Sequence, residues 1–163
     1  MINKQQKINW SILLHDIRSI QNVASIFRMA ECLGTNNIYL SGITPGPLDR
    51  FEREREDFNK ISLGTEKVVK WERIENPEEF ILNFKKDGVV IALEQNESSV
   101  DYKNMEIDVN KKYLVIPGRE VEGLDENILK LCDVVAEIPQ YGNKESLNIF
   151  SSMSVACFRF FDR

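Results

Sequence analysis

Short apolar runs alternate with amphipathic stretches along almost the whole chain, and this alternation limits the possible folds more than any other feature. Runs with strand character lie at residues 12–17, 38–40, 68–71, 89–94, 113–117 and 134–139. Most of them are continuously apolar, which is typical of parallel strands covered on both faces. The pattern therefore predicts an α/β fold with a mostly parallel sheet and helices on both faces.

The stretches between these runs have helical periodicity. Residues 23–30 carry apolar side chains at the i, i+3, i+4 and i+7 spacing of an amphipathic helix, and Gly34 follows as a stop signal. Further helices are expected from residue 76, from residue 124 and from Ser146 onward. Ligands of such folds bind beyond the carboxyl ends of the strands. The polar turns after Leu93, Pro117 and Pro139 are therefore where a site is expected.

Two polar stretches do not fit the alternation. Residues 49–60 mix arginines and a lysine with five carboxylates. A solvated helix or loop face with local ion pairs is favoured there over a patch that contacts RNA. Residues 95–111 are polar and weakly periodic, so a surface loop is expected.

Composition narrows the class of protein. A chain of 163 residues, 42% of them hydrophobic, can bury the core of one domain without disulfides or metal. The cysteines Cys32, Cys132 and Cys157 are far apart in apolar contexts, so we expect reduced thiols and no zinc site. The first twenty residues lack the apolar core of a signal peptide and no run is long enough to span a bilayer, which predicts a cytoplasmic protein without a membrane partner.

The net charge also limits the partners. At −5 it argues against a general attraction of the whole molecule to nucleic acid, because neutralisation of phosphates supplies most sequence-independent affinity. An RNA partner would therefore have to meet a local basic patch.

The first motif is "GREVEGL" at 118–124, directly after an apolar strand. It can be a plain turn in which Gly118 and Gly123 supply unusual backbone angles. Alternatively, Gly118 lets the backbone approach a ligand while Glu120 offers a carboxylate at the edge of the sheet. The segment lacks the GxGxxG spacing of dinucleotide-binding folds and the GKS/T ending of phosphate loops, so both of these readings are excluded.

The second motif is "AEIPQYGNKESLNIFSSMSVACFRFF" at 136–161. A turn at Gly142 and a helix cap at Ser146 would explain those two residues structurally. This structural interpretation leaves Leu147 and Asn148 unexplained. An apolar side chain beside an amide at a helix start could line an adenine pocket.

The third motif is the helix predicted at 19–34, where Asn22 and Arg28 fall outside the apolar stripe. An exposed arginine on a helix is usually a solvated charge. A fixed guanidinium near a strand end could instead hold a phosphate through two parallel hydrogen bonds. His15, the only histidine, is read as a strand-end residue.

Together, four segments resemble the SpoU (TrmH-like) class of the SPOUT RNA methyltransferases. They are "NVASIFRMAECLG" at 22–34, "IALEQ" at 91–95, "VIPGREVEGL" at 115–124 and "EIPQYGNKESLNIFSSMSVA" at 137–156. They occur in the family's order, and the resemblance extends from about His15 to the end of the chain. It implies a C-terminal deep trefoil knot, S-adenosylmethionine as cofactor, a homodimer, and methyl transfer to a ribose 2′-hydroxyl of RNA.

The resemblance also assigns roles to residues. The cofactor-binding positions are Leu93, Gly118, Ile138, Ser146 and Leu147. The catalytic positions are Arg28, Asn22, Glu120, Ser146 and Asn148. The RNA-binding residues are inferred from charge and not from the resemblance: a dimer could compensate for the acidity of the chain by joining arginines across its two subunits. These arginines are Arg18, Arg50, Arg53 and Arg55, together with Arg28.

The chemistry of the guanidinium decides which role Arg28 is given. Its pKa above about 12 makes it a poor base at neutral pH. We therefore expect Arg28 to grip the target phosphate and stabilise the developing alkoxide, while the proton leaves through that phosphate, Ser146 or water.

Some positions depart from the resemblance. Family members commonly carry Gly at Ala24, Asn at Arg119, Gly at Val121 and Met at Gln140. Because Arg28, Glu120, Ser146 and Asn148 are present, we expect catalysis to be retained. The length predicts a single methyltransferase domain over 1–163, without a separate RNA-binding domain, and by analogy its small size favours tRNA over rRNA as the substrate. The alternatives are a catalytically inactive protein of the same fold that binds RNA or supports assembly, and an unrelated α/β enzyme.

Overall fold

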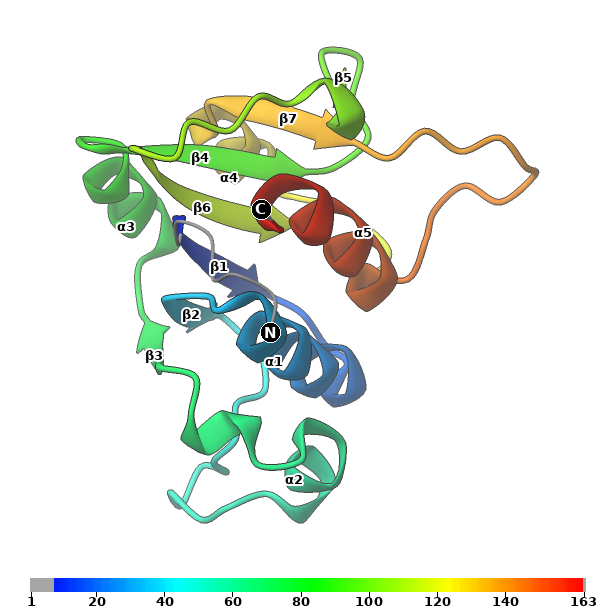
Figure 1. Cartoon of the computed structure of the whole chain (residues 1–163). Helices are drawn as coiled ribbons and strands as arrows, with labels where there is room; N and C mark the ends of the chain where they lie inside the picture. Colours follow the sequence, from blue (N-terminus) through cyan, green and yellow to red (C-terminus); the bar gives the residue numbers. More distant parts are fainter. Residues whose placement is uncertain (1–7, 163) are drawn as a thin grey trace, which may run out of the picture.

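A single sheet with parallel pairing throughout organises the chain, for which the computed structural model describes residues 8–162 (Figure 1). Its strands are β1 (Asn9–His15), β2 (Asn37–Ser41), β3 (Trp71–Ile74), β4 (Gly88–Leu93), β5 (Val100–Asp101), β6 (Lys112–Pro117) and β7 (Val134–Glu137). Their order in the sheet is β3-β2-β1-β6-β4-β7-β5, and every pair is parallel. The predicted parallel α/β fold is confirmed.

Four strands differ from the prediction in place or length by more than one residue. β1 begins at Asn9 and ends at His15, whereas 12–17 was predicted, and β7 ends at Glu137 and not at residue 139. The largest differences concern β3 and β5. The third strand was expected at 68–71 but occupies Trp71–Ile74, because Val68 instead ends a short 3-10 helix, η1 (Thr65–Lys67), and is exposed. The predicted surface loop at 95–111 contains the two-residue strand β5 and a second 3-10 helix, η2 (Tyr102–Asn104). Both strands lie at the two edges of the sheet, where each pairs with one neighbour only.

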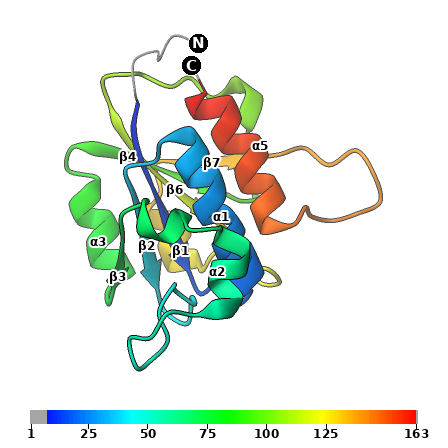
Figure 2. The same ribbon diagram turned by 60° about the horizontal axis from the view of Figure 1, so that its bottom comes forward.

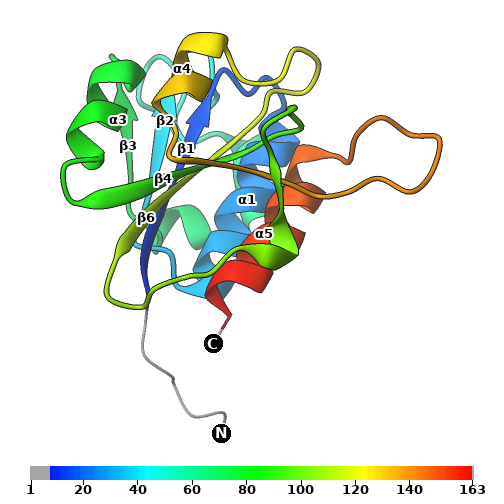
Figure 3. The same ribbon diagram turned by 90° about the horizontal axis from the view of Figure 1, so that it is seen from above.

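Helices cover both faces of the sheet. On one face lie α1 (Ile20–Leu33) and α5 (Ile149–Phe161), with α2 (Glu56–Ser62) packed against α1; on the other lie α3 (Pro77–Phe84) and α4 (Glu126–Leu131) (Figures 2 and 3). The helix at 23–34 is confirmed: Ser19 caps its start, and Gly34 ends it with a left-handed backbone angle. A deep trefoil knot stays a prediction.

The central strands alternate their side chains between two hydrophobic cores. In β4, Ile91 and Leu93 join the core beneath α1 and α5, whereas Val90 and Ala92 join the core beneath α3 and α4. Since both sets are buried, the strand reads as a continuous apolar run rather than an alternating one. The continuous apolar runs led to the prediction of a sheet covered on both faces, and the two cores confirm it.

The polar segment between β7 and α5 leaves the body of the domain. Residues 141–148 are all exposed, and the segment extends away from the sheet in each view (Figures 1–3).

No helix within residues 8–162 has the length and apolar character needed to cross a membrane.

Candidate functional site

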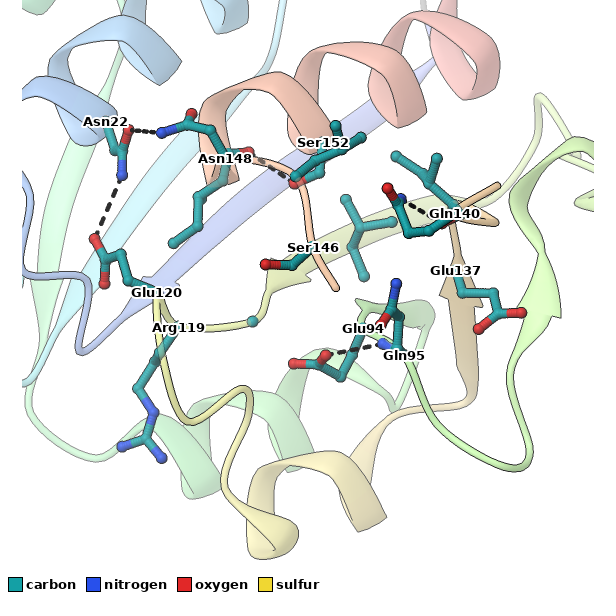
Figure 4. Close-up of a pocket in the computed structure, with 15 residues that line it drawn as sticks. Asn22, Glu94, Gln95, Arg119, Glu120, Glu137, Gln140, Ser146, Asn148 and Ser152 are labelled. Carbon is teal, nitrogen blue, oxygen red and sulfur yellow. Dashed lines mark hydrogen bonds between the residues drawn. The ribbon is translucent and has the colours of Figure 1, made fainter. Parts of the chain in front are cut away.

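A cavity of about 360 Å³ opens where the central strands β4, β6 and β7 end. The loops that follow these strands form one side of it, and the first turns of α1 and α5 form the other (Figure 4). Its lining residues are Asn22, Leu93, Glu94, Gln95, Gly118, Arg119, Glu120, Glu137, Ile138, Gln140, Ser146, Leu147, Asn148, Ile149 and Ser152. The site therefore lies at the carboxyl edge of the sheet, as the fold class predicts.

Most of the residues singled out from the sequence meet in this cavity. All five positions predicted to bind the cofactor line it: Leu93, Gly118, Ile138, Ser146 and Leu147. Four positions predicted to be catalytic also line it: Asn22, Glu120, Ser146 and Asn148. Segments separated by up to 126 residues thus contribute to one site. The roles of the individual residues stay predictions.

Three of these side chains form a hydrogen-bonded chain. The Asn148 amide donates to the Asn22 side-chain oxygen at 3.0 Å, and the Asn22 amide donates to Glu120 at 3.4 Å (Figure 4). The Glu120 carboxylate also accepts the backbone N–H groups of Ser19 and Arg18 at 3.1 and 3.3 Å. A negative charge at the start of α1 interacts favourably with the helix dipole. These hydrogen bonds hold the 118–124 loop against the first turns of α1 and α5.

The last helix starts later than the sequence suggested. Asn148, and not Ser146, is its N-cap: the Asn148 side-chain oxygen accepts the backbone N–H groups of Phe150 and Ser151 at 2.9 and 3.3 Å. The prediction of Ser146 as the cap was therefore wrong. Ser146 instead lies on the exposed segment, and its hydroxyl forms no hydrogen bond to the other residues drawn in Figure 4.

The glycines of the 118–124 loop serve two different purposes. Gly123 has a φ of +69°, the left-handed angle that was expected there. Gly118 does not have a positive φ, so the expectation of an unusual angle at that position was wrong. A Cβ at Gly118 would instead lie 2.1 Å from a carboxylate oxygen of Glu94, and a Cβ at Gly123 would lie 2.6 Å from the same atom. The two glycines make room for the Glu94 carboxylate.

Arg119 lines the cavity but holds the same loop through a guanidinium that points away from it. Its Nε donates to the Gly123 carbonyl at 2.7 Å and its Nη2 donates to Asp125 at 2.6 Å, so the guanidinium points away from the cavity (Figure 4). Asp125 and Asp16 also flank the His15 ring, whose Nδ1 lies 2.9 Å from the Ser41 hydroxyl. His15 ends β1, as its reading as a strand-end residue predicted.

Arg28 is not brought to the cavity. It lies on the exposed side of α1 and donates to the Ile61 carbonyl at the end of α2, at 3.4 Å. Its role therefore stays a prediction, and within one chain this side chain faces α2.

Of the other arginines predicted to bind RNA, Arg18, Arg50 and Arg53 are exposed and Arg55 is partly buried, and three of the four have carboxylate partners. Arg53 makes two hydrogen bonds to Asp49, Arg55 makes two to Asp57, and Arg18 lies 4.0 Å from Glu122, while Arg50 stacks on Phe51. The Arg53 hydrogen bond lowers the pKa of Asp49 to about 2, and Arg55 lowers the pKa of Asp57. The ion pairs predicted within 49–60 are thus present.

Seven lining residues were not predicted as site residues from the sequence: Glu94, Gln95, Arg119, Glu137, Gln140, Ile149 and Ser152. Glu94 directly follows β4 and Glu137 is the last residue of β7, and this position at a strand end is a signal that could have identified them. Gln140 and Ser152 carry no such signal, because their inclusion depends on the path of the segment between β7 and α5.

Nearly the whole sequence that forms this fold and cavity matches a known protein family. A family model described as "SpoU rRNA Methylase family" matches residues 9–158, a range that contains every strand and nearly all of α5. The chain belongs to the SpoU rRNA methylase family. The resemblance read from the sequence is thereby confirmed, as is the family's fold.

Relatives of this SpoU family member include enzymes of known and assigned activity. The tRNA (guanosine(18)-2′-O)-methyltransferase of Aquifex aeolicus is 26% identical over 151 residues, which cover 91% of this chain and 66% of the relative. A crystal structure of an AdoMet-bound rRNA methyltransferase from Sinorhizobium meliloti superposes with a TM-score of 0.82 at 24% identity, over 94% of this chain and 56% of that chain.

A third match confirms the fold at lower identity. The SpoU methyltransferase AviRb from Streptomyces viridochromogenes superposes with a TM-score of 0.80 at 20% identity, over 94% of this chain and 58% of that chain. The chain spans less than two thirds of the length of the curated relatives it matches.

Proposed function

We propose that this chain is an S-adenosylmethionine-dependent RNA methyltransferase that transfers a methyl group to a ribose 2′-hydroxyl, with tRNA as the preferred substrate. The observation that carries the proposal is the single cavity in which the predicted cofactor positions and the Glu120–Asn22–Asn148 chain meet. Family membership supports methyl transfer to RNA. The preference for the ribose hydroxyl and for tRNA rests on the Aquifex relative.

The cavity suits an adenosyl ligand in size and in chemistry. Its volume of about 360 Å³ lies within the range of small-molecule sites. Leu93, Ile138 and Leu147 offer apolar walls for an adenine ring, and backbone groups of the three strand-end loops can read its edge. Three carboxylates line the cavity while the Arg119 guanidinium points away, so the lining favours a cation over a phosphate. S-adenosylmethionine carries a sulfonium and an ammonium group.

The cofactor supplies an activated methyl carbon, and the residues of the chain supply position and proton handling. Holding the ribose oxygen in line with that carbon provides much of the acceleration. Asn22 and Asn148 are fixed by their hydrogen bonds and would orient the ribose or its phosphate. Glu120 already accepts two backbone N–H groups and the Asn22 amide, so its role is to position Asn22. The Ser146 hydroxyl is free to take part in proton transfer.

Arg28 is proposed to grip the target phosphate. Since its side chain faces α2 in one chain, the proposal requires RNA that reaches this face, or a second chain whose Arg28 lies near this cavity. The proposed homodimer is supported by the side chains that α5 exposes, Val155 and Phe158, which are 42% and 44% accessible. Light scattering would test the dimer directly.

The decisive experiment combines calorimetry with nucleoside analysis. The purified chain should bind S-adenosylmethionine and should add a 2′-O-methyl mark to unmodified tRNA, measured by mass spectrometry of nucleosides. Arg28→Lys should keep cofactor binding and lose most turnover, because an ammonium cannot make the two parallel hydrogen bonds of a guanidinium. If the lysine variant turns over normally, the proposed phosphate grip is wrong.

The competing function is a catalytically inactive protein of the same fold that binds RNA or supports assembly. The position of Arg28 away from the cavity is the observation that favours it. Absence of S-adenosylmethionine binding together with retained RNA binding would establish this alternative.

A further inference from the structure

The carboxylate of Glu94, which lines the cavity, is held by backbone N–H groups and faces two glycines. Glu94 follows the last residue of β4, and its backbone N–H donates to the Ala136 carbonyl of β7 at 3.0 Å. Its carboxylate accepts the backbone N–H of Gln95 at 2.8 Å (Figure 4). It also accepts the backbone N–H of Leu124 at 3.0 Å. The side chain therefore contacts backbone from the loop after β6 as well as its own loop.

The space for this carboxylate exists only because two loop positions lack a side chain. A Cβ at Gly118 would meet the Glu94 carboxylate oxygen at 2.1 Å, and a Cβ at Gly123 would meet it at 2.6 Å. Real Cβ atoms essentially never approach another atom so closely. A seat made by two glycines and two N–H donors holds the carboxylate in one place at the cavity wall.

The carboxylate of Glu94 has no counter-ion in the described part of the chain. The ion pairs formed between residues 8 and 162 do not include Glu94. Of these residues, Arg119 is the only cationic one that lines the cavity, and its guanidinium is bound to Gly123 and Asp125. An ionised carboxylate has about four acceptor sites, of which the two N–H groups use two. Capacity therefore remains for a ligand.

We propose that Glu94 contacts the cofactor and supplies the counter-charge for its positive part. This inference rests on the proposed function, since it takes S-adenosylmethionine as the ligand. Glu94 would then determine specificity: it favours the charged methyl donor over uncharged adenosine compounds that fit the same apolar walls. The positive charge can be the sulfonium or the ammonium group, and the two can be separated by experiment.

Three ligands that share the adenosyl group provide the test. S-adenosylmethionine carries both cations, S-adenosylhomocysteine keeps only the ammonium, and methylthioadenosine has neither. Calorimetry on the full chain should show that Glu94→Gln weakens S-adenosylmethionine binding about tenfold while methylthioadenosine binding stays unchanged. Unchanged S-adenosylhomocysteine binding would identify the sulfonium as the partner, and parallel weakening would identify the ammonium.

Two further variants make the test specific. Glu97→Gln removes an exposed carboxylate of the same loop that does not line the cavity, and should change none of the three affinities. Glu94→Asp keeps the charge and should keep most of the preference for S-adenosylmethionine over methylthioadenosine. This variant also preserves the test if Glu94→Gln fails to fold, which circular dichroism would reveal.

Other outcomes would overturn the inference. Equal weakening of all three ligands by Glu94→Gln would show that the carboxylate only shapes the loop, and no change in any affinity would show that it is a bystander. Both outcomes leave the proposed function intact, provided that the unmodified chain binds S-adenosylmethionine. Absence of binding by the unmodified chain would instead reject the proposed function.

Discussion

Replacing Gly118 by alanine tests the seat of Glu94 most directly. The added Cβ would lie 2.1 Å from the Glu94 carboxylate oxygen, so the side chain must move and give up its hydrogen bond from Leu124. A hydrogen bond to a charged group contributes about 1.5–3 kcal/mol, so we expect the free energy of unfolding to fall by about 2 kcal/mol. Because the clashing atom is the end of a flexible side chain, the chain should still fold.

A double-mutant cycle separates this mechanism from a general effect of alanine. Glu94→Ala alone loses the same hydrogen bond and should also cost about 2 kcal/mol. The double variant loses that bond only once and has no clash, so it too should cost about 2 kcal/mol, which gives a coupling energy of about 2 kcal/mol. Urea unfolding followed by circular dichroism measures all three values.

The control is Gly142→Ala. A Cβ at Gly142 would meet nothing within 4 Å, and its φ is not positive, so the free energy of unfolding should change by no more than about 0.5 kcal/mol. If the losses in free energy of unfolding caused by Gly118→Ala and Glu94→Ala simply add in the double variant, the coupling energy is zero. That result would refute the reasoning that Gly118 is needed to accommodate the Glu94 carboxylate.

Three further predictions follow from other contacts. Asn148→Ala removes both the α5 cap and the hydrogen bond that the Asn148 amide donates to Asn22, whereas Asn148→Asp keeps the capping oxygen and loses only the bond to Asn22. Asn148→Ala should therefore lower the free energy of unfolding by about 1 kcal/mol more than Asn148→Asp, and equal losses in urea unfolding would contradict the capping role. The pKa of Asp49 is lowered from 3.8 to about 2, so its contribution to stability is present above pH 3.8 and is lost as the pH falls through 2. Arg53→Gln should raise the pKa of Asp49 in an NMR titration, and an unchanged pKa would refute the pairing of Arg53 with Asp49. Burial raises the pKa of Cys132 to about 12, so in the native state a thiol reagent should modify the exposed Cys32 first, and rapid modification of all three cysteines would contradict the burial.

The layers of the fold could be predicted because burial imposes a simple pattern on the sequence. Strands β4 and β6 were predicted within one residue at each end, since both faces of each are covered and the runs are continuously apolar. The edge strand β3 was misplaced because its sequence, "WERI", has two charged residues that face solvent. The strand β5 has only two residues, too few to produce any periodicity.

The candidate site was predictable in outline for a different reason. Its residues follow strands or begin helices, and the resemblance to a family placed them together. Glu94 was missed because its importance depends on Gly118 and Gly123 lying opposite it, a relation between segments about 25 residues apart. The direction of Arg28 could not be predicted either, since it depends on where α2 packs against α1.

The order of strands in the sheet has a consequence for when the site can form. β1 pairs with β6 in the register Asn9↔Lys112, so the two halves of the sheet cannot join until more than one hundred residues have been synthesised. Contacts between such distant segments slow folding, because the entropy of closing a long loop must be overcome first. The earliest strands therefore stay unpaired until later ones have been synthesised, and the cavity is complete only when the first turn of α5 has emerged from the ribosome.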